Sequence, residues 1–235
     1  MQILLIGYGK MGKTIEAVAN ERKHRIAGKI DPTEGHSFDF KTKVDVAIEF
    51  TSPESALTNI KMCLDHNIPV LSGTTGWLEK KRSIDEYCNA HHGTFFYASN
   101  FSLGVNLFFK LNEKLARMME GQGTYEPSIE ETHHTQKKDA PSGTAITLAE
   151  GVLNNLSRKK QWVCENPGET DLVIHSFRKD PVPGTHVVTY RSDLDDIEIK
   201  HTAHSREGFA RGAVMVAEWL TAQKGVLSMD DFLKF

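Results

Sequence analysis

The chain has 235 residues, 39% of them hydrophobic and 25% charged, and a formal net charge of −3. This length can bury one large core or two modest ones, and the charge balance gives no reason to expect a nucleic-acid partner. No segment has the roughly 20 consecutive apolar residues of a membrane-spanning helix. Cys63, Cys88 and Cys164 match neither a zinc pattern nor a disulfide framework, so we expect a cytoplasmic protein with no membrane partner.

In the first hundred residues, short apolar runs alternate with amphipathic segments. The residues after Gly12 predict a helix to about residue 21, and Pro53 in a first turn predicts a second helix to about residue 66. Strands that alternate with helices at this spacing indicate βαβ units and a mostly parallel sheet. The strands are expected at residues 2–6, 25–30, 44–50, 68–71 and 94–98.

The pattern changes after residue 101. Leucines recur every four residues from Leu103 to Leu115, which predicts a long amphipathic helix. A second helix follows Pro141, and a last helix is expected at residues 209–223. Residues 154–170 read as an irregular, exposed connection. Further strands are expected at residues 128–132, 172–178, 186–191 and 197–202, with a hairpin turn at 193–196.

These elements predict an α/β protein with two parts. The first is a Rossmann-like nucleotide-binding domain made of residues 1–101 and 208–235. The second, residues 102–207, is an α+β domain whose sheet is mixed.

The first turn has the form of a dinucleotide-binding loop. The run Gly7-Tyr8-Gly9-Lys10-Met11-Gly12 fits G-x-G-x-x-G, follows an expected strand and opens an expected helix. The helix N-terminus would face a pyrophosphate, and Asp31 ends the second strand where a carboxylate can bind ribose hydroxyls. Asp31 disfavours a 2′-phosphate and Lys10 partly offsets it, so NADH and NADPH both remain open as cofactors.

A cluster of cationic and imidazole side chains lies in residues 130–144. His133 or His134 can donate a proton at cellular pH. Ser142 is a suitable N-cap, which would leave the amides of Gly143 and Thr144 open to a carboxylate. Lys137 adds a full positive charge, and each hydrogen bond to a charged group is worth about 1.5–3 kcal/mol. The same residues could instead form a basic surface loop before an ordinary capped helix. Together with the nucleotide loop, they favour a reductase that acts on a small anionic substrate.

Several motifs resemble one known family. Residues 131–145 match the pattern E-x-H-H-x-x-K-x-D-A-P-S-G-T-A at every fixed position. This segment closely resembles the signature of the 4-hydroxy-tetrahydrodipicolinate reductase (dihydrodipicolinate reductase) family, and the resemblance spans nearly the whole chain. Other matching motifs are Phe50-Thr51-x-Pro53-Glu54, residues 73–76, Ser99-Asn100-Phe101-Ser102-x-Gly104-Val105-Asn106, residues 183–186 and His201-x-Ala203-x-Ser205-Arg206.

The resemblance implies a reaction and a role for each matching residue. The family reduces a cyclic imine dicarboxylate with NADH or NADPH and no metal, in diaminopimelate and lysine synthesis, and its members are usually homotetramers built through the substrate domain. By resemblance, His133 is the general acid/base, Lys137 assists it, and His134 binds substrate together with Ser142, Gly143 and Thr144. The implied cofactor-binding residues are Gly7, Tyr8, Gly9, Lys10, Met11, Gly12, Asp31, Gly73, Thr74, Thr75, Ala98, Ser99, Asn100 and Phe101.

The sequence departs from the family pattern near the cofactor. The loop is one residue shorter than the common form, Lys10 replaces arginine, Pro32 follows Asp31, and residues 34–43 are shortened. These departures leave the choice between NADH and NADPH open. Outside the family motifs, His201 and His204 are three residues apart on an expected strand and would point to opposite faces, so we expect no metal there.

Two other functions are compatible with parts of this pattern. An aspartate or homoserine dehydrogenase would share the two-domain plan but lack the segment that carries His133 and Lys137. A nucleotide-sensing regulator would be expected to lose one of those two residues, and both are present.

Overall fold

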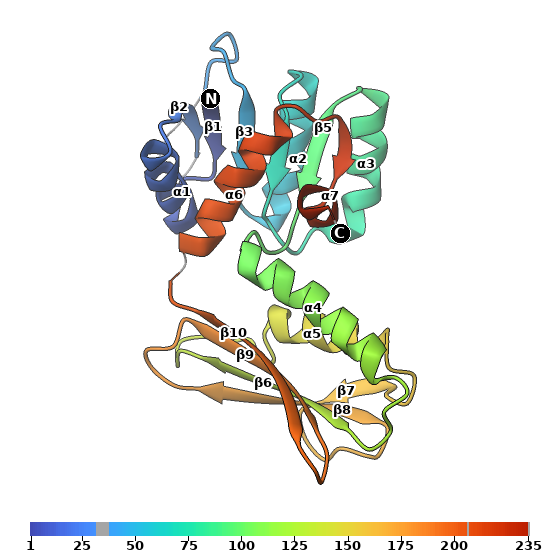
Figure 1. Ribbon diagram of the computed structural model, residues 1–235. Coiled ribbons are helices and arrows are strands. Elements are labelled where there is room, and N and C mark those ends of the chain that lie inside the picture. The colour runs from blue at the N-terminus through green and yellow to red at the C-terminus, as the bar shows by residue number, and fades with distance from the viewer. Residues whose placement is uncertain (32–37, 206, 235) are drawn as a thin grey trace. The chain divides into compact units, whose positions relative to one another are not determined.

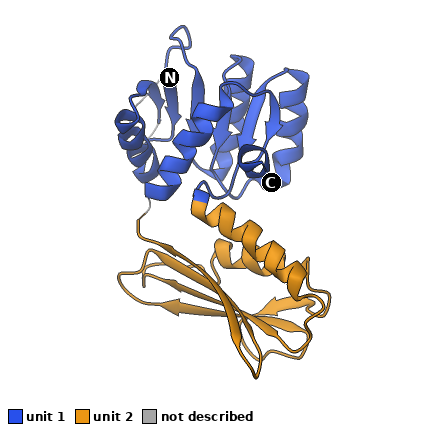
Figure 2. Cartoon of the chain, in the orientation of Figure 1, with its two compact units in different colours: residues 1–103, 207–235 blue, residues 104–206 orange. Residues whose placement is uncertain are grey.

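The computed structural model describes residues 1–31, 38–205 and 207–234. The chain forms two compact units: unit 1 comprises Met1–Leu103 and Glu207–Phe235, and unit 2 comprises Gly104–Arg206 (Figure 2). Pro32, Arg206 and part of the shortened segment 34–43 lie outside the described residues.

Unit 1 is built on a six-stranded parallel sheet in the order β11-β5-β4-β3-β1-β2. Strands β1 and β3 are neighbours although β2 separates them in the chain, so the strand order reverses at β1. Such a reversal is where α/β sheets bind ligands. The strands are β1 Gln2–Ile6, β2 Arg25–Ile30, β3 Val46–Glu49, β4 Val70–Ser72, β5 Thr94–Tyr97 and β11 Gly225–Leu227. The expected parallel sheet is confirmed, and only β11 had not been predicted.

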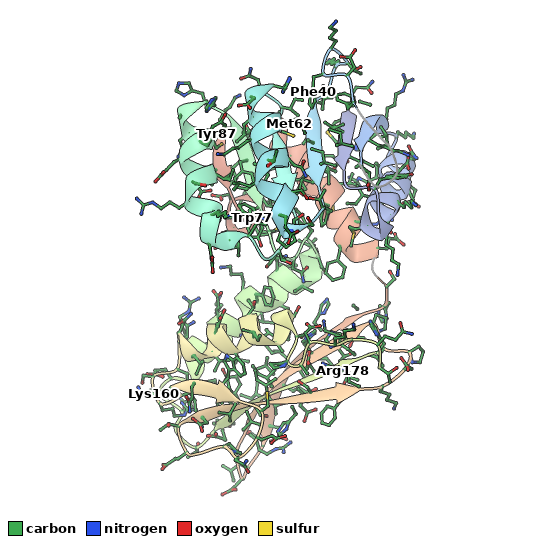
Figure 3. The ribbon with its side chains drawn as sticks, turned by 180° about the vertical axis from the view of Figure 1, so that it is seen from behind. Phe40, Met62, Trp77, Tyr87, Lys160 and Arg178 are labelled. Atoms are coloured by element: carbon green, nitrogen blue, oxygen red, sulfur yellow. The ribbon has the colours of Figure 1, made fainter. Side chains whose placement is uncertain are left out.

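Helices cover both faces of this sheet (Figure 1). Helices α1 (Lys10–Glu21) and α6 (Glu207–Leu220) pack on one face, and α2 (Pro53–Asp65) and α3 (Lys81–Ala90) on the other. Figure 3 shows the second pair from behind. Helix α3 was not predicted from the sequence, since only Ile84 and Cys88 of its ten residues are buried. The 3-10 turn Leu78–Lys80 and the short α7 (Met229–Leu233) were not predicted either.

Unit 2 contains a five-stranded mixed sheet in the order β10-β9-β6-β8-β7. Strands β10, β9 and β6 pair antiparallel, while β8 is parallel to both β6 and β7. The strands are β6 Glu126–His133, β7 Gln161–Val163, β8 Asp171–Arg178, β9 Gly184–Arg191 and β10 Asp196–Ala203. The predicted mixed sheet and the turn before β10 are confirmed. The expectation that residues 154–170 are wholly irregular is wrong, because β7 lies within them.

Helices α4 (Leu103–Met119) and α5 (Gly143–Leu153) pack on one face of the second sheet (Figure 1). The extent of α4 is as predicted, but its leucine stripe is not the buried face. Leu107 and Leu111 are 47% and 51% exposed, whereas Phe108 and Asn112 are buried. The Asn112 side chain donates a hydrogen bond of 2.9 Å to the Leu148 carbonyl of α5, which fixes this rotation of the helix. No helix among the described residues is long and apolar enough to cross a membrane.

Candidate active site

Three glycines with different surroundings shape the turn between β1 and α1. Gly7 has a φ of +88°, and a Cβ there would lie 1.9 Å from the carbonyl oxygen of Phe50. A Cβ on Gly12 would lie 2.3 Å from the carbonyl oxygen of Gly7. Around Gly9, the N-cap of α1, no described atom would lie within 4 Å of a Cβ, and no side chain caps the helix. The turn is therefore packed at Gly7 and Gly12 and open at Gly9, where a ligand can approach the helix N-terminus.

The open turn borders a cavity of about 380 Å³ in unit 1. Asp31 lies on its wall, 9% exposed, and Oδ2 of Asp31 accepts a hydrogen bond of 2.7 Å from the Tyr8 amide. Amides at a helix N-terminus and a neighbouring carboxylate are the groups that bind the pyrophosphate and ribose of a dinucleotide, so these residues fit NAD(P)H. The lining consists of Ile6, Gly7, Gly9, Ile30, Asp31, Phe50, Thr51, Ser52, Ser55 and Asn59.

Three other predicted cofactor residues differ in what their side chains contact. The Tyr8 hydroxyl donates to Glu16, and Lys29 Nζ lies 3.7 Å from the centre of the Tyr8 ring and 2.9 Å from Glu16. Met11 packs against the core, while Lys10 is exposed in the first turn of α1. Of the three, Lys10 is the residue whose side chain is exposed at the helix start.

The predicted cofactor loop 73–75 is attached to a buried carboxylate. Glu49, which has no exposed surface, accepts hydrogen bonds from Ser72 Oγ at 2.5 Å, Thr74 Oγ1 at 2.9 Å and the Thr51 amide at 3.1 Å. The Thr74 hydroxyl also accepts from the Thr51 amide at 2.8 Å. The Thr74 side chain is therefore occupied inside the protein, and the Thr74 carbonyl accepts a hydrogen bond of 2.7 Å from Trp77 Nε1.

The predicted cofactor residues 98–101 include two buried and two at least partly exposed side chains. Ala98 and Phe101 are 7% and 2% exposed, and the Phe101 ring packs 5.6 Å from that of Phe50. Ser99 is exposed and Asn100 partly exposed. Within this segment, Ser99 and Asn100 are thus the residues with side-chain surface to offer.

In unit 2, three buried side chains meet on the helix-covered face of the sheet. Glu131 and His133 are two residues apart on β6 and share a face, and Glu131 pairs directly with His186 on β9. Glu131 Oε2 lies 3.1 Å from His133 Nδ1 and 3.7 Å from His186 Nε2. The exposed fractions of Glu131, His133 and His186 are 0%, 7% and 4%. The predicted acid/base residue is therefore held against a buried carboxylate.

The charge states of this cluster follow from its surroundings. Burial alone would raise the pKa of Glu131, but contacts with His133 and Ser142 outweigh it and bring the pKa well below its ordinary value. Burial, together with the charge of His133, lowers the pKa of His186 to about 4. At neutral pH Glu131 is ionised and His186 is uncharged.

Ser142 caps α5, as the sequence predicted. Its Oγ accepts a hydrogen bond of 3.2 Å from the Ala145 amide and lies 3.1 Å from His186 Nε2. Its own amide donates to Glu131 Oε1 at 3.2 Å. The start of α5 is thereby attached to the buried cluster.

The next two amides, of Gly143 and Thr144, belong to a first turn that offers them no intrahelical acceptor. A Cβ on Gly143 would meet no described atom within 4 Å. This open helix start suits a carboxylate. Lys137 Nζ lies 2.9 and 2.8 Å from the two carboxylate oxygens of Asp139, an ion pair that the sequence analysis did not foresee.

Arg178, which Figure 3 labels, is the last residue of β8 and lies opposite His133 in the pairing of β6 with β8. Its guanidinium donates to Glu131 Oε1 at 3.2 and 3.3 Å, to the Lys137 carbonyl at 3.3 Å and to the Asp139 carbonyl at 2.6 Å. Arg178 therefore joins the segment that carries Lys137 to the buried carboxylate.

His134 has a different environment from His133. It lines a cavity of about 390 Å³ together with Gln136, the 180–183 turn and Ser205. The two histidines that the sequence offered as proton donors are thus distinguished, because His133 lies in the charged cluster and His134 on a cavity wall.

Ligand atoms of Glu131, His133 and His186 lie within 4.8 Å of one another, a grouping that can bind a metal ion. The Arg178 guanidinium already pairs with Glu131, and its positive charge opposes a cation at the same place. We therefore assign no metal to this cluster.

Comparisons with known proteins agree with the motifs. Residues 1–101 match the family model described as dihydrodipicolinate reductase, N-terminus, and residues 104–233 match that described as dihydrodipicolinate reductase, C-terminus. The chain belongs to the dihydrodipicolinate reductase family. It is therefore an oxidoreductase of a nucleotide-binding family, and the expectation from the motifs is confirmed.

Individual relatives extend over most of the chain. A 4-hydroxy-tetrahydrodipicolinate reductase from Christiangramia forsetii is 52% identical over 235 residues, covering 99% of this chain and 98% of the relative. One from Methanosarcina acetivorans is 38% identical, covering 82% of this chain and 74% of the relative. The dipicolinate-bound dihydrodipicolinate reductase from Paenisporosarcina sp. TG-14 superimposes with a TM-score of 0.78 at 20% identity, covering 99% of both chains, which shows a shared fold.

Glu131, Arg178 and His186 had no predicted role, although Glu131 and His186 lie within the family motifs. Nothing in the linear sequence links Glu131 to His186, fifty-five positions later. The pairing of β6 with β9 and β8 brings the three together. The sequence signal that could have pointed to Glu131 is a glutamate two residues before a candidate acid/base histidine on an expected strand, where both side chains share one face.

Proposed function

We propose that this chain reduces 4-hydroxy-tetrahydrodipicolinate to tetrahydrodipicolinate with NADH or NADPH, in diaminopimelate and lysine synthesis. The main support is His133, held by a buried carboxylate beside the open start of α5. The motif identity and the 52% identical relative that bears this enzyme's name point to the same reaction.

The substrate would bind in unit 2 through its carboxylates. The amides of Gly143 and Thr144 and the helix dipole of α5 supply partial positive charge, and Lys137 supplies a full charge. Because Lys137 is paired with Asp139, a substrate carboxylate would compete with Asp139 for the ammonium group. Dipicolinate, a ring with two carboxylates, is bound by the structurally similar enzyme from Paenisporosarcina.

The nicotinamide cofactor would bind at the cavity of unit 1 and supplies a hydride when bound. Gly9 and the first turn of α1 would hold its pyrophosphate, and Asp31 its ribose. We propose that NADH is used well, because Asp31 is positioned to repel a 2′-phosphate, and that Lys10 makes NADPH usable.

Loss of the 4-hydroxyl group of the substrate as water leaves a conjugated imine, and addition of hydride to that imine gives an anion that must be protonated. His133 is the proposed donor, because its Nδ1 faces Glu131, which leaves Nε2 to exchange a proton with the substrate. The positive charge of Lys137 would stabilise the electron-rich ring as it forms.

The decisive experiment is nicotinamide oxidation with substrate generated freshly by the preceding synthase reaction. We expect turnover with NADH and with NADPH, and their ratio of kcat/KM gives the preference. Binding of NADH without turnover would indicate a sensor. Turnover with aspartate or homoserine and NAD⁺ instead would indicate a different dehydrogenase.

We further propose that the protein works in the cytoplasm as a homotetramer assembled through unit 2. The sheet face opposite α4 and α5 carries no helix in Figure 1 and includes Phe177, which is 50% exposed. Light scattering coupled to gel filtration should give four times the 26.3 kDa chain mass. A replacement of Phe177 by glutamate should dissociate the assembly if this face forms the interface.

A further inference from the structure

Glu131 is a carboxylate with no exposed surface, and the proposed chemistry does not require it to touch the substrate. Burying an ionised carboxylate costs several kcal/mol unless charged and hydrogen-bonding partners compensate it. The residues on either side of it on the same face are Ile129, which is part of the core, and His133. A leucine at this position could be buried without the desolvation cost of a charge, so the presence of a glutamate needs an explanation.

The two oxygens of Glu131 divide between two sets of partners. Oε1 accepts from the Ser142 amide at 3.2 Å and from the Arg178 guanidinium at 3.2 and 3.3 Å. Oε2 lies 3.1 Å from His133 Nδ1 and 3.7 Å from His186 Nε2. One carboxylate therefore contacts the proposed acid/base residue and, through its other oxygen, the start of the helix proposed to bind the substrate.

The contact with His133 has a particular chemical consequence. Glu131 Oε2 and His133 Nδ1 are within hydrogen-bonding distance but are not aligned as a hydrogen bond in this structure. A carboxylate can only accept, so a proton on His133 is favoured at Nδ1, and Nε2 is left for exchange with a ligand. Nε2 lies beside Gly184, where an added Cβ would be only 3.1 Å away, so the absence of a side chain at Gly184 leaves space at this nitrogen.

Arg178 extends the same connection to Lys137. It bonds Glu131 and also the carbonyl groups of Lys137 and Asp139. Arg178 therefore links the buried carboxylate to the segment that carries Lys137.

We propose that Glu131 is a positioning residue for the reduction: it fixes the tautomer and orientation of His133 and holds the Ser142 end of α5 at a constant distance from it. This inference rests on the proposed function and adds a residue to it. Glu131 itself would not contact the substrate.

The test is Glu131→Gln, with Glu130→Gln as the matched control. Glutamine keeps the shape and can still accept from the Ser142 amide, but its NH₂ group would oppose a proton on His133 Nδ1. Glu130 is the adjacent residue of β6, exposed and on the opposite face. We expect kcat of Glu131→Gln to fall by about 10²-fold, with less than about threefold change in the KM for NADH, and Glu130→Gln to match the wild type.

Two further measurements separate positioning from general damage. Calorimetric titration with pyridine-2,6-dicarboxylate, an inert dianion, should give a dissociation constant within about threefold of wild type in Glu131→Gln, because the amides of α5 remain. The ¹⁵N shifts of the His133 ring, assigned by comparison with His133→Gln, should report a proton on Nδ1 in the wild type and a change of tautomer in Glu131→Gln.

The outcomes distinguish this inference from the proposed function. Wild-type kcat and an unchanged His133 tautomer in Glu131→Gln would overturn it while leaving the reductase assignment intact. If the wild type shows no turnover, the proposed function fails, and the ring shifts alone decide whether Glu131 orients His133. If Glu131→Gln does not fold, Glu131→Asp, whose carboxylate is drawn back by one methylene, should still lose about tenfold in kcat; full activity in that variant would overturn the inference.

Discussion

Two helices of this protein, α1 in unit 1 and α5 in unit 2, begin in comparable ways and are used differently. In each, a carboxylate from a neighbouring strand accepts the backbone amide just before the helix: Asp31 binds the Tyr8 amide at 2.7 Å, and Glu131 binds the Ser142 amide at 3.2 Å. Both helix starts are also open where a side chain is missing, at Gly9 and at Gly143.

The difference lies in what else each carboxylate faces. Asp31 lines a cavity, so a ligand can reach it. Glu131 is fully buried and faces His133 and Arg178, so it acts on other side chains. By our proposal, comparable backbone arrangements therefore bind a ligand in one unit and orient a proton donor in the other.

The largest expected effect concerns the proton donor. His133→Ala should lower kcat by on the order of 10²-fold or more, because a general acid/base contributes about that factor. NADH affinity should stay near wild type, because His133 lies in unit 2 and the proposed cofactor residues lie in unit 1. Steady-state kinetics and fluorescence titration with NADH measure the two quantities. Wild-type kcat in His133→Ala would remove this residue from the role.

The second largest effect is expected at the start of α1, where a substitution should weaken ligand binding without affecting folding. Gly9→Ala places a methyl group in open space, so the fold should tolerate it while the pyrophosphate site is obstructed. Losing one or two charged hydrogen bonds at about 1.5–3 kcal/mol each predicts a rise in the NADH dissociation constant of at least about tenfold.

Gly12→Ala provides the contrast, because its Cβ would lie 2.3 Å from the Gly7 carbonyl oxygen. That overlap should cost about 1–3 kcal/mol of unfolding free energy, measured by urea unfolding without cofactor. Equal stability losses in Gly9→Ala and Gly12→Ala would contradict the distinction between an open and a packed glycine.

A third, smaller effect is expected at the other helix start. Gly143→Ala should leave the unfolding free energy unchanged or slightly higher, because alanine suits a first helical turn and meets no described atom. The methyl group should hinder approach to the Gly143 and Thr144 amides and raise the substrate KM about tenfold at unchanged NADH affinity. A rise in the NADH dissociation constant instead would show that the two helix starts are not separate sites.

The sequence was enough to predict the elements whose signals are local. The continuous apolar run Gln2–Ile6 and the glycines after it identify the first βα turn, and Ser142 with Pro141 identifies the start of α5. Helix α3 was missed because its sequence KRSIDEYCNA buries only two side chains, so the polar residues dominate its pattern. The leucines of α4 showed the period of a helix but not which face is buried, since the buried face includes Asn112.

The residues of the candidate site also fall into two groups: those that a local motif reveals and those that depend on strand pairing. His133, Lys137 and Ser142 lie within ten consecutive residues, so a local motif reveals them. Glu131 could have been noticed there, but its partners depend on register: His186 is opposite it on β9, and Arg178 is opposite His133 on β8. A one-residue slip of either strand would move those side chains to the other face of the sheet, and periodicity in one sequence does not determine that register.

The last prediction concerns the pH dependence of stability and is expected from the buried histidine of unit 2. His186 faces Glu131, His133 and Ser142, with Lys137 and His201 nearby, and its pKa is lowered to about 4, mainly by burial. Between pH 6.5 and about 4, the unfolded chain would hold a proton on this residue that the folded chain lacks. The unfolding free energy should therefore decrease as the pH falls through that window, by up to about 1.4 kcal/mol per pH unit from this group.

Replacing the histidine tests that assignment. His186→Gln cannot titrate, so its unfolding free energy should decrease less steeply than that of the wild type between pH 6.5 and pH 4.5, as measured by urea unfolding at several pH values. His175→Gln, an exposed histidine on β8 of the same sheet, is the control and should follow the wild-type slope. If the curves of His186→Gln and wild type ran parallel, the pKa of His186 would not be lowered in the folded chain, and His186 would not be the buried neutral group inferred from its place beside Glu131.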